Sequence, residues 1–374
     1  MKKNRQAVAV MFFIFGCTFG TWASRIPLIQ EKLALNHAEL GTFLLALPIG
    51  SLCSLPTTGW LSTRFQSRSL VLFSALLSCT ALPMIALSPH VFLLGAVLFV
   101  FGLSNNLLNI SANIQAVMVE FTYQKPIMSS FHALFSFGSM IGATTSWAME
   151  QYQVPLLPHF TSVWLFFVVL ALYFQTQLIP KDTKPEKPQP IFAMPDSTLI
   201  GLGLIAFCVM IGEGAMADWS SIYLKEHLGK NTETSSLGFT AFSFAMTAGR
   251  FSGDFLAARF GTIKLLKING LATCLGMLLA LLFPYPVFIL IGFILVGLGL
   301  STGVPLVYSL VGRSQTMPTG VALAAVSTVG VTGFLIGPPL IGFLAELSSL
   351  RIALLLIAVL SAMMIFLANK AKES

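Results

Sequence analysis

The sequence has very little charge. Only 9% of its 374 residues are Asp, Glu, Lys or Arg, whereas about 25% is usual for a soluble domain. Hydrophobic residues make up 56% of the chain, and the mean hydropathy is +0.85. This number of charged residues is too small to cover a surface that faces water, which excludes a soluble globular protein. The composition predicts an all-α membrane protein whose surroundings are the lipid bilayer.

Signals for metal, cofactor and nucleotide chemistry are also missing. The five cysteines form no CxxC pair and lie in apolar runs, and neither an HExxH motif nor a phosphate-binding loop with Lys occurs. We therefore expect no enzyme activity, no catalytic residues, no metal site and no cofactor. The net charge of +7 comes from basic residues scattered between apolar runs, so no nucleic-acid partner is expected either.

Apolar residues fall into twelve runs, each close to the ~20 residues that one helix needs to cross the membrane. The runs lie at residues 7–27, 39–61, 70–88, 91–118, 129–150, 160–179, 197–222, 236–255, 265–284, 286–311, 319–344 and 350–369. They predict twelve transmembrane helices.

Basic residues indicate the orientation of these helices. An even number of helices places both termini on one side of the membrane. If that side is the cytoplasm, the 21 Lys and Arg residues all lie inside except Arg25, Lys32, Lys225, Lys230 and Arg351. Because short cytoplasmic loops are enriched in Lys and Arg, we expect cytoplasmic termini in a multi-pass protein of the cytoplasmic (inner) membrane.

The chain divides near its middle. Residues 180–195, P-K-D-T-K-P-E-K-P-Q-P-I-F-A-M-P, are too rich in proline and charge to lie in lipid. They predict a first half at 1–179, a cytoplasmic linker at 180–196 and a second half at 197–374. Short motifs also recur about 195–197 residues apart, among them G-L-S at 102–104 and 299–301. The halves are therefore expected to be six-helix pseudo-repeats.

One loop motif carries a family resemblance. Residues 59–68, G-W-L-S-T-R-F-Q-S-R, resemble the signature G-x-L-x-D-R-x-G-R-R of the major facilitator superfamily, with Thr63 at the Asp position and Gln66 at the Gly position. Residues 253–261, G-D-F-L-A-A-R-F-G, resemble a second copy whose acid, Asp254, is nearer the start. A parallel repeat of two six-helix halves is the organisation of that superfamily.

Three further motifs, E-G-A-M-A-D-W-S (213–220), S-S-F-H-A-L-F-S (129–136) and G-F-L-I-G-P-P-L-I-G (333–342), narrow the resemblance. They are similar to a largely uncharacterised bacterial branch that is distantly similar to sugar permeases such as fucose permease.

The resemblance implies a secondary active transporter that works by alternating access, with a small polar solute, sugar-like or another metabolite, bound near mid-membrane. Proton symport is one form of this function, so protons are candidate partners, and a monomer is expected. The alternative is a drug or metabolite efflux carrier of the same fold, which a cavity lined by Phe and Met would favour.

Asparagines gather on the segment 91–118. At about 100° per residue, Asn105, Asn109 and Asn113 form one stripe, joined by Asn106. Carboxamides both donate and accept hydrogen bonds, which suits a polar solute and predicts a substrate pathway. The alternative is that these side chains bond neighbouring helices.

Two acids lie in the first segment of the second half. Glu213 is the deeper one, and Asp218 lies five residues further along the same predicted helix. Burial disfavours the charged form of a carboxyl group, so both are candidates for proton coupling. A structural pair with an Arg or a hydroxyl is the alternative for Glu213, and a helix-end acid paired with Lys225 or Arg25 is the alternative for Asp218.

Trp22 and Trp219 occupy matching positions in the two halves. Either they stack on a solute in the pathway, or they belong to an interfacial aromatic belt.

Charged residues at the predicted cytoplasmic ends resemble the gate of the superfamily. They are Arg64 and Glu120 in the first half and Arg250, Asp254 and Arg259 in the second. Ordinary positive-inside anchoring is the alternative for the arginines.

Overall fold

The computed structural model describes residues 2–123, 127–181, 199–228, 234–312 and 319–370, and these residues form helices with no strand. The prediction of an all-α protein is thus confirmed for this part of the chain. Two compact units are present, one of residues 1–35 with 43–186 and the other of residues 36–42 with 187–374.

The helices of the first unit are α1 (Lys2–Ser24), α2 (Ile26–Lys32), α4 (Ala46–Arg64), α5 (Ser67–Leu87), α6 (Val91–Tyr123), α7 (Met128–Gln151), α8 (Leu156–Phe174) and the 3₁₀ turn η1 (Gln175–Gln177). The helices of the second unit are α9 (Ile200–His227), α10 (Leu237–Phe260), α11 (Thr262–Leu282), α12 (Pro286–Ser301), α13 (Gly303–Gly312), α14 (Thr319–Leu347) and α15 (Leu350–Lys370). The short helix α3 (His37–Leu44) begins within residues 36–42.

Local sequence explains several helix ends. Gly261 has φ 78°, a left-handed conformation that glycine adopts without a steric penalty, and it separates α10 from α11. Proline stands in the first turn of α2 and of α12, where its missing N–H leaves no hydrogen bond unmade. The predicted segment 286–311 is interrupted at Thr302, so it forms α12 and α13 rather than one helix.

Ten helical stretches of the described residues are long and apolar enough to cross a membrane. The other two predicted segments, 129–150 and 236–255, form α7 and α10. Each of these helices has 24 residues, enough for about 36 Å at 1.5 Å per residue, but they carry many hydroxyl groups and some charge. Their assignment as membrane helices therefore depends on length, not on hydropathy. The predicted linker 180–196 lies outside the described residues except for its first two positions.

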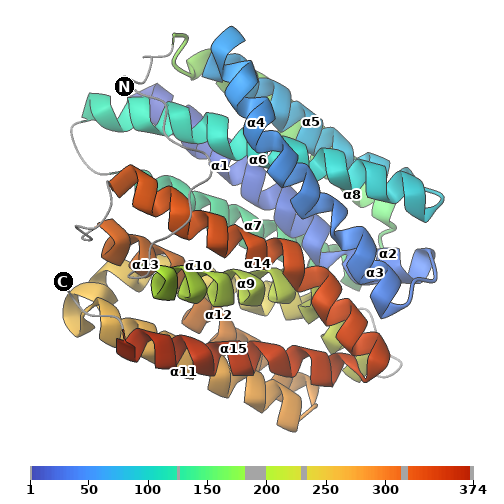
Figure 1. Cartoon of the computed structure of the whole chain (residues 1–374). Coiled ribbons are helices and arrows are strands. Elements are labelled where there is room, and N and C mark those ends of the chain that lie inside the picture. Colours follow the sequence, from blue (N-terminus) through green and yellow to red (C-terminus); the bar gives the residue numbers. More distant parts are fainter. Residues whose placement is uncertain (1, 124–126, 182–198, 229–233, 313–318, 371–374) are drawn as a thin grey trace. The chain divides into compact units, whose positions relative to one another are not determined.

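Helices pack in the same order within each unit (Figure 1). In the first unit, α1 packs on α7, α4 and α5 pack on α6, and α5 also packs on α8. In the second unit, α9 packs on α14, α10 and α11 pack on α12, and α11 also packs on α15. The repeated short motifs of the sequence thus lie in units whose helices pair alike.

Glycines allow a close contact between α1 and α7. A Cβ atom added to Gly16 would lie 1.9 Å from the Phe135 carbonyl oxygen, and one added to Gly142 would lie 2.4 Å from that of Cys17. Small residues at helix interfaces let the backbones of membrane helices approach closely. These glycines therefore hold α1 against α7 at backbone contact distance.

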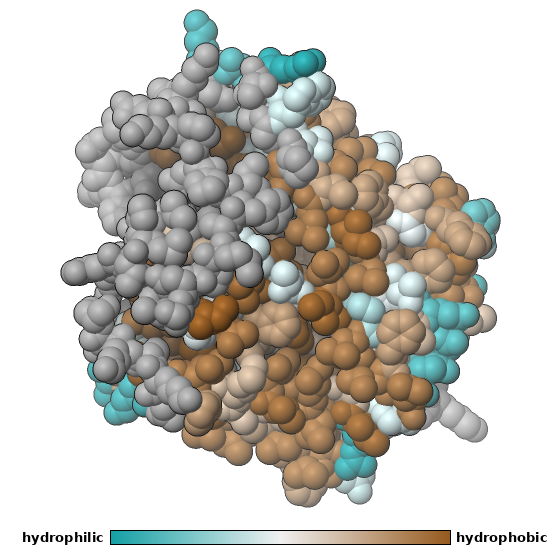
Figure 2. All heavy atoms as spheres, in the orientation of Figure 1, coloured by the Kyte–Doolittle hydropathy of each residue, from teal (hydrophilic) through white to brown (hydrophobic). Residues whose placement is uncertain are grey.

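Large apolar side chains cover the outside of the helices. On α8 alone, Leu165, Phe166, Val169 and Tyr173 are each more than half exposed. Figure 2 shows apolar residues over most of the described surface on one face, with hydrophilic residues towards its margins. Exposed apolar surface of this extent is unfavourable in water, so lipid is the medium that this surface contacts.

Candidate functional site

A charged pair lies inside the second unit. Glu213 on α9 faces Arg250 on α10, and the Arg250 Nη2 atom lies 3.3 and 3.5 Å from the two Glu213 carboxylate oxygens. Only 16% of the Glu213 side chain and 23% of the Arg250 side chain are exposed. Ionised groups among apolar helices are costly and are usually paired and functional. The pairing with an Arg is the structural alternative that the sequence left open for Glu213.

Tight helix packing brings Arg250 to this position. A Cβ atom added to Gly249 would lie 2.1 Å from Ser301 Oγ, and one added to Gly253 would lie 2.5 Å from Thr302 Cγ2. These two glycines therefore let α10 approach the end of α12. The carbonyl groups at a helix C-terminus lack intrahelical donors and attract cations, and Arg250 Nε accordingly donates to the Ser301 carbonyl at 3.4 Å.

Residues 299–303, G-L-S-T-G, match the letters of the serine-hydrolase G-x-S-x-G pattern. However, Ser301 ends a helix instead of following a strand, and its hydroxyl donates to the Leu298 carbonyl at 2.7 Å. Ser301 thus has a backbone partner inside a helix and is not placed as a nucleophile.

Two hydroxyl groups lie near the charged pair. Ser327 Oγ on α14 donates to Tyr308 Oη on α13 at 2.7 Å, and both side chains are half-buried. Tyr308 lies close enough to Glu213 to feel its charge, although among the described residues no hydrogen bond joins the two side chains. The site therefore combines a cation, an anion and two hydroxyl groups from four helices of one unit, α9, α10, α13 and α14.

Asp218 lies one and a half turns beyond Glu213 on α9. It is partly buried, and within the described residues it has neither a hydrogen-bond nor an ion-pair partner. The sequence interpretation of Asp218 as an acid paired with Lys225 or Arg25 therefore has no contact to support it. Arg25 forms its ion pair within the first unit instead.

The asparagines of α6 separate into two groups. Asn105 accepts a hydrogen bond from Ser78 on α5 at 2.7 Å, and Asn106 donates to Ser54 on α4 at 2.6 Å. These two asparagines thus make the interhelical bonds that were the alternative to a solute role. Asn113 Nδ2 donates to the Asn109 side-chain and backbone oxygens, both at 2.9 Å.

Asn109 and Asn113 are only half-buried, and their hydrogen bonds remain on their own helix. Of the four asparagines predicted to line the pathway, these two are the ones whose described hydrogen bonds do not join α6 to another helix.

The two tryptophans are fully buried. Trp22 is 1% exposed and lies edge-on to Phe101 with ring centroids 6.5 Å apart. Trp219 is 0% exposed, lies 5.9 Å from the ring of His37, and its indole Nε1 has no hydrogen-bond partner among the described residues. Neither ring lies at an exposed surface, as a belt residue would.

The arginines of the predicted gate lie at helix ends. Arg64 is exposed at the end of α4, with its guanidinium 4.2 Å above the Trp60 ring. Arg259 is exposed at the end of α10, 5.6 Å from the Phe260 ring. The side chains of Glu120 and Asp254 lie outside the described residues. Arg250, which was grouped with them, lies beside Glu213.

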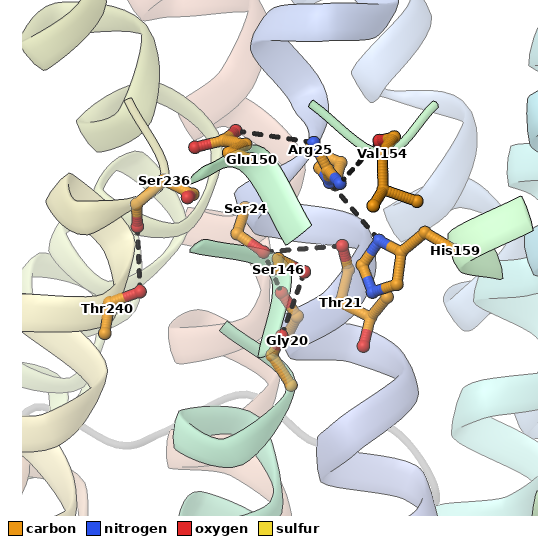
Figure 3. Close-up of polar contacts among 11 residues, drawn as sticks. Gly20, Thr21, Ser24, Arg25, Ser146, Glu150, Val154, His159, Ser236 and Thr240 are labelled. Atoms are coloured by element: carbon orange, nitrogen blue, oxygen red, sulfur yellow. Dashed lines mark hydrogen bonds and ion pairs between the residues drawn. The ribbon is translucent and has the colours of Figure 1, made fainter. Parts of the chain in front are cut away.

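A buried charge cluster in the first unit was not identified from the sequence (Figure 3). Arg25 Nη1 lies 3.8 Å from Glu150 Oε1, Arg25 Nη2 donates to the Val154 carbonyl at 3.2 Å, and Arg25 Nε donates to His159 Nδ1 at 3.3 Å. Arg25 is 1% exposed. Burial lowers the pKa of its guanidinium, and the Glu150 carboxylate opposes that shift.

The cluster joins the end of α1 to the connection between α7 and α8. Glu150, an acid inside a predicted apolar run, was the sequence signal that could have revealed it. Its partners could not be identified, because Arg25 lies 125 residues before Glu150 in the chain.

Comparison with known proteins agrees with this architecture. The sequence matches the Major Facilitator Superfamily over residues 8–311 and again over residues 202–372. An uncharacterized MFS-type transporter of Yersinia pestis is 33% identical over 357 residues, which cover 96% of this chain and 93% of that protein.

Two solved structures have a similar fold. A variant of the nucleoside transporter NupG aligns with a TM-score of 0.78 at 14% identity, over 98% of this chain and 99% of its own. A variant of the E. coli fucose:proton symporter FucP aligns with a TM-score of 0.64 at 16% identity, over 99% and 98%. At these identities the likeness extends to the fold alone. The family match and the Yersinia relative, together with the apolar helices described above, show that this multi-pass membrane protein belongs to the major facilitator superfamily of transporters.

Proposed function

We propose that the chain is a secondary active transporter that moves a small polar solute, sugar-like or another metabolite, across the cytoplasmic (inner) membrane by alternating access. The observation that carries the proposal is the Glu213–Arg250 ion pair inside a largely apolar helix bundle. Ionisable residues within membrane helices mark solute and ion pathways because a merely structural role rarely compensates for their cost.

The proposed architecture has twelve transmembrane helices in two six-helix halves, residues 1–179 and 197–374. A cytoplasmic linker at 180–196 joins them, and both termini are cytoplasmic. The distribution of basic residues supports this orientation. We expect a C-terminal reporter enzyme that is active only in the periplasm to be inactive on this chain; activity there would refute the orientation.

In this proposal Asn109 and Asn113 line the solute pathway in the first half, because their described hydrogen bonds leave them available to a ligand. Asn105 and Asn106 hold α6 against its neighbours. Arg64 and Arg259 act at the cytoplasmic gate, which their matching positions at the ends of α4 and α10 support.

Glu213 is the proposed site of proton coupling. When ionised it pairs with Arg250, and when protonated it loses that attraction, so the pair can alternate between two states. Asn109 cannot titrate, so the first half offers no equivalent acid at that position. Asp218, which lies nearer the end of α9, tunes Glu213 or shapes the outer mouth.

The test begins with a thermal-shift screen of the purified protein against sugars and other small metabolites, followed by uptake of a labelled hit into proteoliposomes. Glu213→Gln keeps hydrogen bonding but cannot release a proton. We expect it to abolish accumulation against a gradient while exchange of solute continues. Glu346→Gln, which neutralises an exposed acid of α14, is the matched control and should accumulate solute normally. Continued uphill accumulation by Glu213→Gln would place the coupling elsewhere.

A further inference from the structure

The Arg250 guanidinium has the features of an anion site. In the second unit, both Glu213 oxygens approach the same nitrogen, Nη2, at 3.3 and 3.5 Å. Charge-assisted N–H···O bonds are usually about 2.7–2.9 Å long, and the strongest Arg–carboxylate pairs use two parallel bonds from two nitrogens. Glu213 therefore holds Arg250 by a long contact and does not make the bidentate pair that a guanidinium favours.

The surroundings of Arg250 fix the guanidinium in position. Its Nε atom donates to the Ser301 carbonyl at the end of α12, and the two glycines that flank it hold α10 against that helix end. A planar guanidinium whose orientation is set in this way presents its donors in a defined direction. The site is thus built to recognise a planar acceptor.

A second polar group lies near the charged pair. Tyr308 Oη accepts a hydrogen bond from Ser327 Oγ at 2.7 Å, so its own O–H group can donate to another acceptor. Among the described residues, Arg250 and Tyr308 are the titratable groups that interact with Glu213.

We propose that the transported solute carries a carboxylate, which binds Arg250 in exchange for Glu213, so that the substrate class is small organic anions. This inference rests on the proposed transport function and specifies its substrate.

The exchange balances in charge. Before binding, the site holds Arg250⁺ and Glu213⁻. The solute carboxylate then takes the place of Glu213 at the guanidinium, and one proton from water adds to a Glu213 oxygen. The site gains one negative charge and one proton together, so no unpaired charge is left in the apolar interior. A neutral sugar, in contrast, would leave the Glu213–Arg250 pair intact.

The test compares carboxylates with neutral analogues of the same shape. The probes are galacturonate against galactose and benzoate against benzamide, each titrated into the purified full-length protein at pH 7 while its thermal unfolding is followed. We expect stabilisation by the carboxylates and not by their neutral partners. In Glu213→Gln, which removes the competing carboxylate, the apparent Kd of the carboxylates should fall by about tenfold or more.

The reciprocal variant removes the guanidinium. Arg250→Gln alone leaves Glu213 without its cation and can fail to fold, so the double variant Glu213→Gln/Arg250→Gln, which is neutral at both positions, is the decisive one. It should lose the preference for carboxylates. Lys264→Gln, which removes an exposed cation at the start of α11, is the control for the loss of a positive charge and should bind as the wild type does.

Three results would each overturn the inference. They are equal stabilisation by the carboxylates and their neutral analogues, no stabilisation of Glu213→Gln by either carboxylate, and an unchanged preference for carboxylates in the double variant. Proteoliposome uptake separates this result from failure of the proposed function. If the protein takes up galactose but not galacturonate, the anionic substrate class is refuted and the proposed transport function still stands. If it transports neither an anion nor any neutral hit from the screen, both the substrate class and the transport function are refuted.

Discussion

The contact between α1 and α7 depends on glycine, and a single methyl group tests it. In Gly142→Ala the new Cβ atom would lie 2.4 Å from the Cys17 carbonyl oxygen and 2.8 Å from the Thr21 amide nitrogen. Real Cβ contacts below 3.0 Å essentially do not occur. Both neighbours are backbone atoms, so the clash cannot be relieved by rotating a side chain, and α1 must move from α7 by at least ~0.6 Å.

The magnitude follows from two opposing effects. Forcing an extra methyl group into a packed interface costs about 1–3 kcal/mol, and replacing Gly by Ala inside a helix gains about 0.8–1.0 kcal/mol. Because α1 and α7 also touch at Gly16, separating them at Gly142 weakens neighbouring contacts. The two effects leave a net loss of about 0–2 kcal/mol, and the weakened neighbouring contacts place the expected loss for Gly142→Ala at the upper end, about 2 kcal/mol.

Gly95→Ala is the matched control within the same unit. Gly95 lies inside α6, and an added Cβ there would meet only the Phe43 side chain at 3.6 Å, an ordinary van der Waals contact. This variant should be as stable as the wild type or up to about 1 kcal/mol more stable.

The assay is thermal unfolding of detergent-purified protein, with gel filtration to confirm that each variant is monodisperse. At about 2–4 °C per kcal/mol for a body of 150–250 residues, the two variants should differ in Tm by about 5–10 °C. If Gly142→Ala unfolds at the same temperature as Gly95→Ala, α1 and α7 are not in backbone contact and the packing argument is wrong.

Two further predictions concern charged residues. Glu150→Gln should lower the free energy of unfolding by about 3–5 kcal/mol, because it leaves Arg25 buried without its counter-ion. The double variant Arg25→Met/Glu150→Met should recover most of that loss. An unchanged unfolding temperature in Glu150→Gln would show that the ion pair is dispensable. Arg64→Ala and Arg259→Ala should each change the labelling of cysteines engineered at the outer mouth. The effect of Arg259→Ala should be larger, because Thr63 replaces the acid of the first signature and weakens that gate; identical labelling in both variants would make the arginines topology anchors.

The helical class, the membrane setting and the family could be predicted from the sequence. Runs of about 20 apolar residues do not depend on tertiary contacts, since lipid forces each run to satisfy its own backbone hydrogen bonds as a helix. Glu213 could be identified for the same reason, as an acid in such a run. Segments 129–150 and 236–255 were also correctly predicted to be helical, as α7 and α10, but they are too polar to be assigned as membrane helices by hydropathy.

The partners of the polar residues were decided by tertiary structure. The spacing of Asn105, Asn106, Asn109 and Asn113 indicates one helix face, but only the positions of α4 and α5 show that the first two bond to neighbouring helices. Arg250 was grouped with a gate because of its position in the chain.

Its ion-pair partner Glu213 lies 37 residues away, and α10 comes close to it because glycine at 249 and 253 leaves room for the Ser301 and Thr302 side chains at the end of α12. Helix formation depends mainly on residues that are close in the sequence, so it can be predicted from the sequence. An ion pair between two helices depends on how those helices pack, which only the tertiary structure shows.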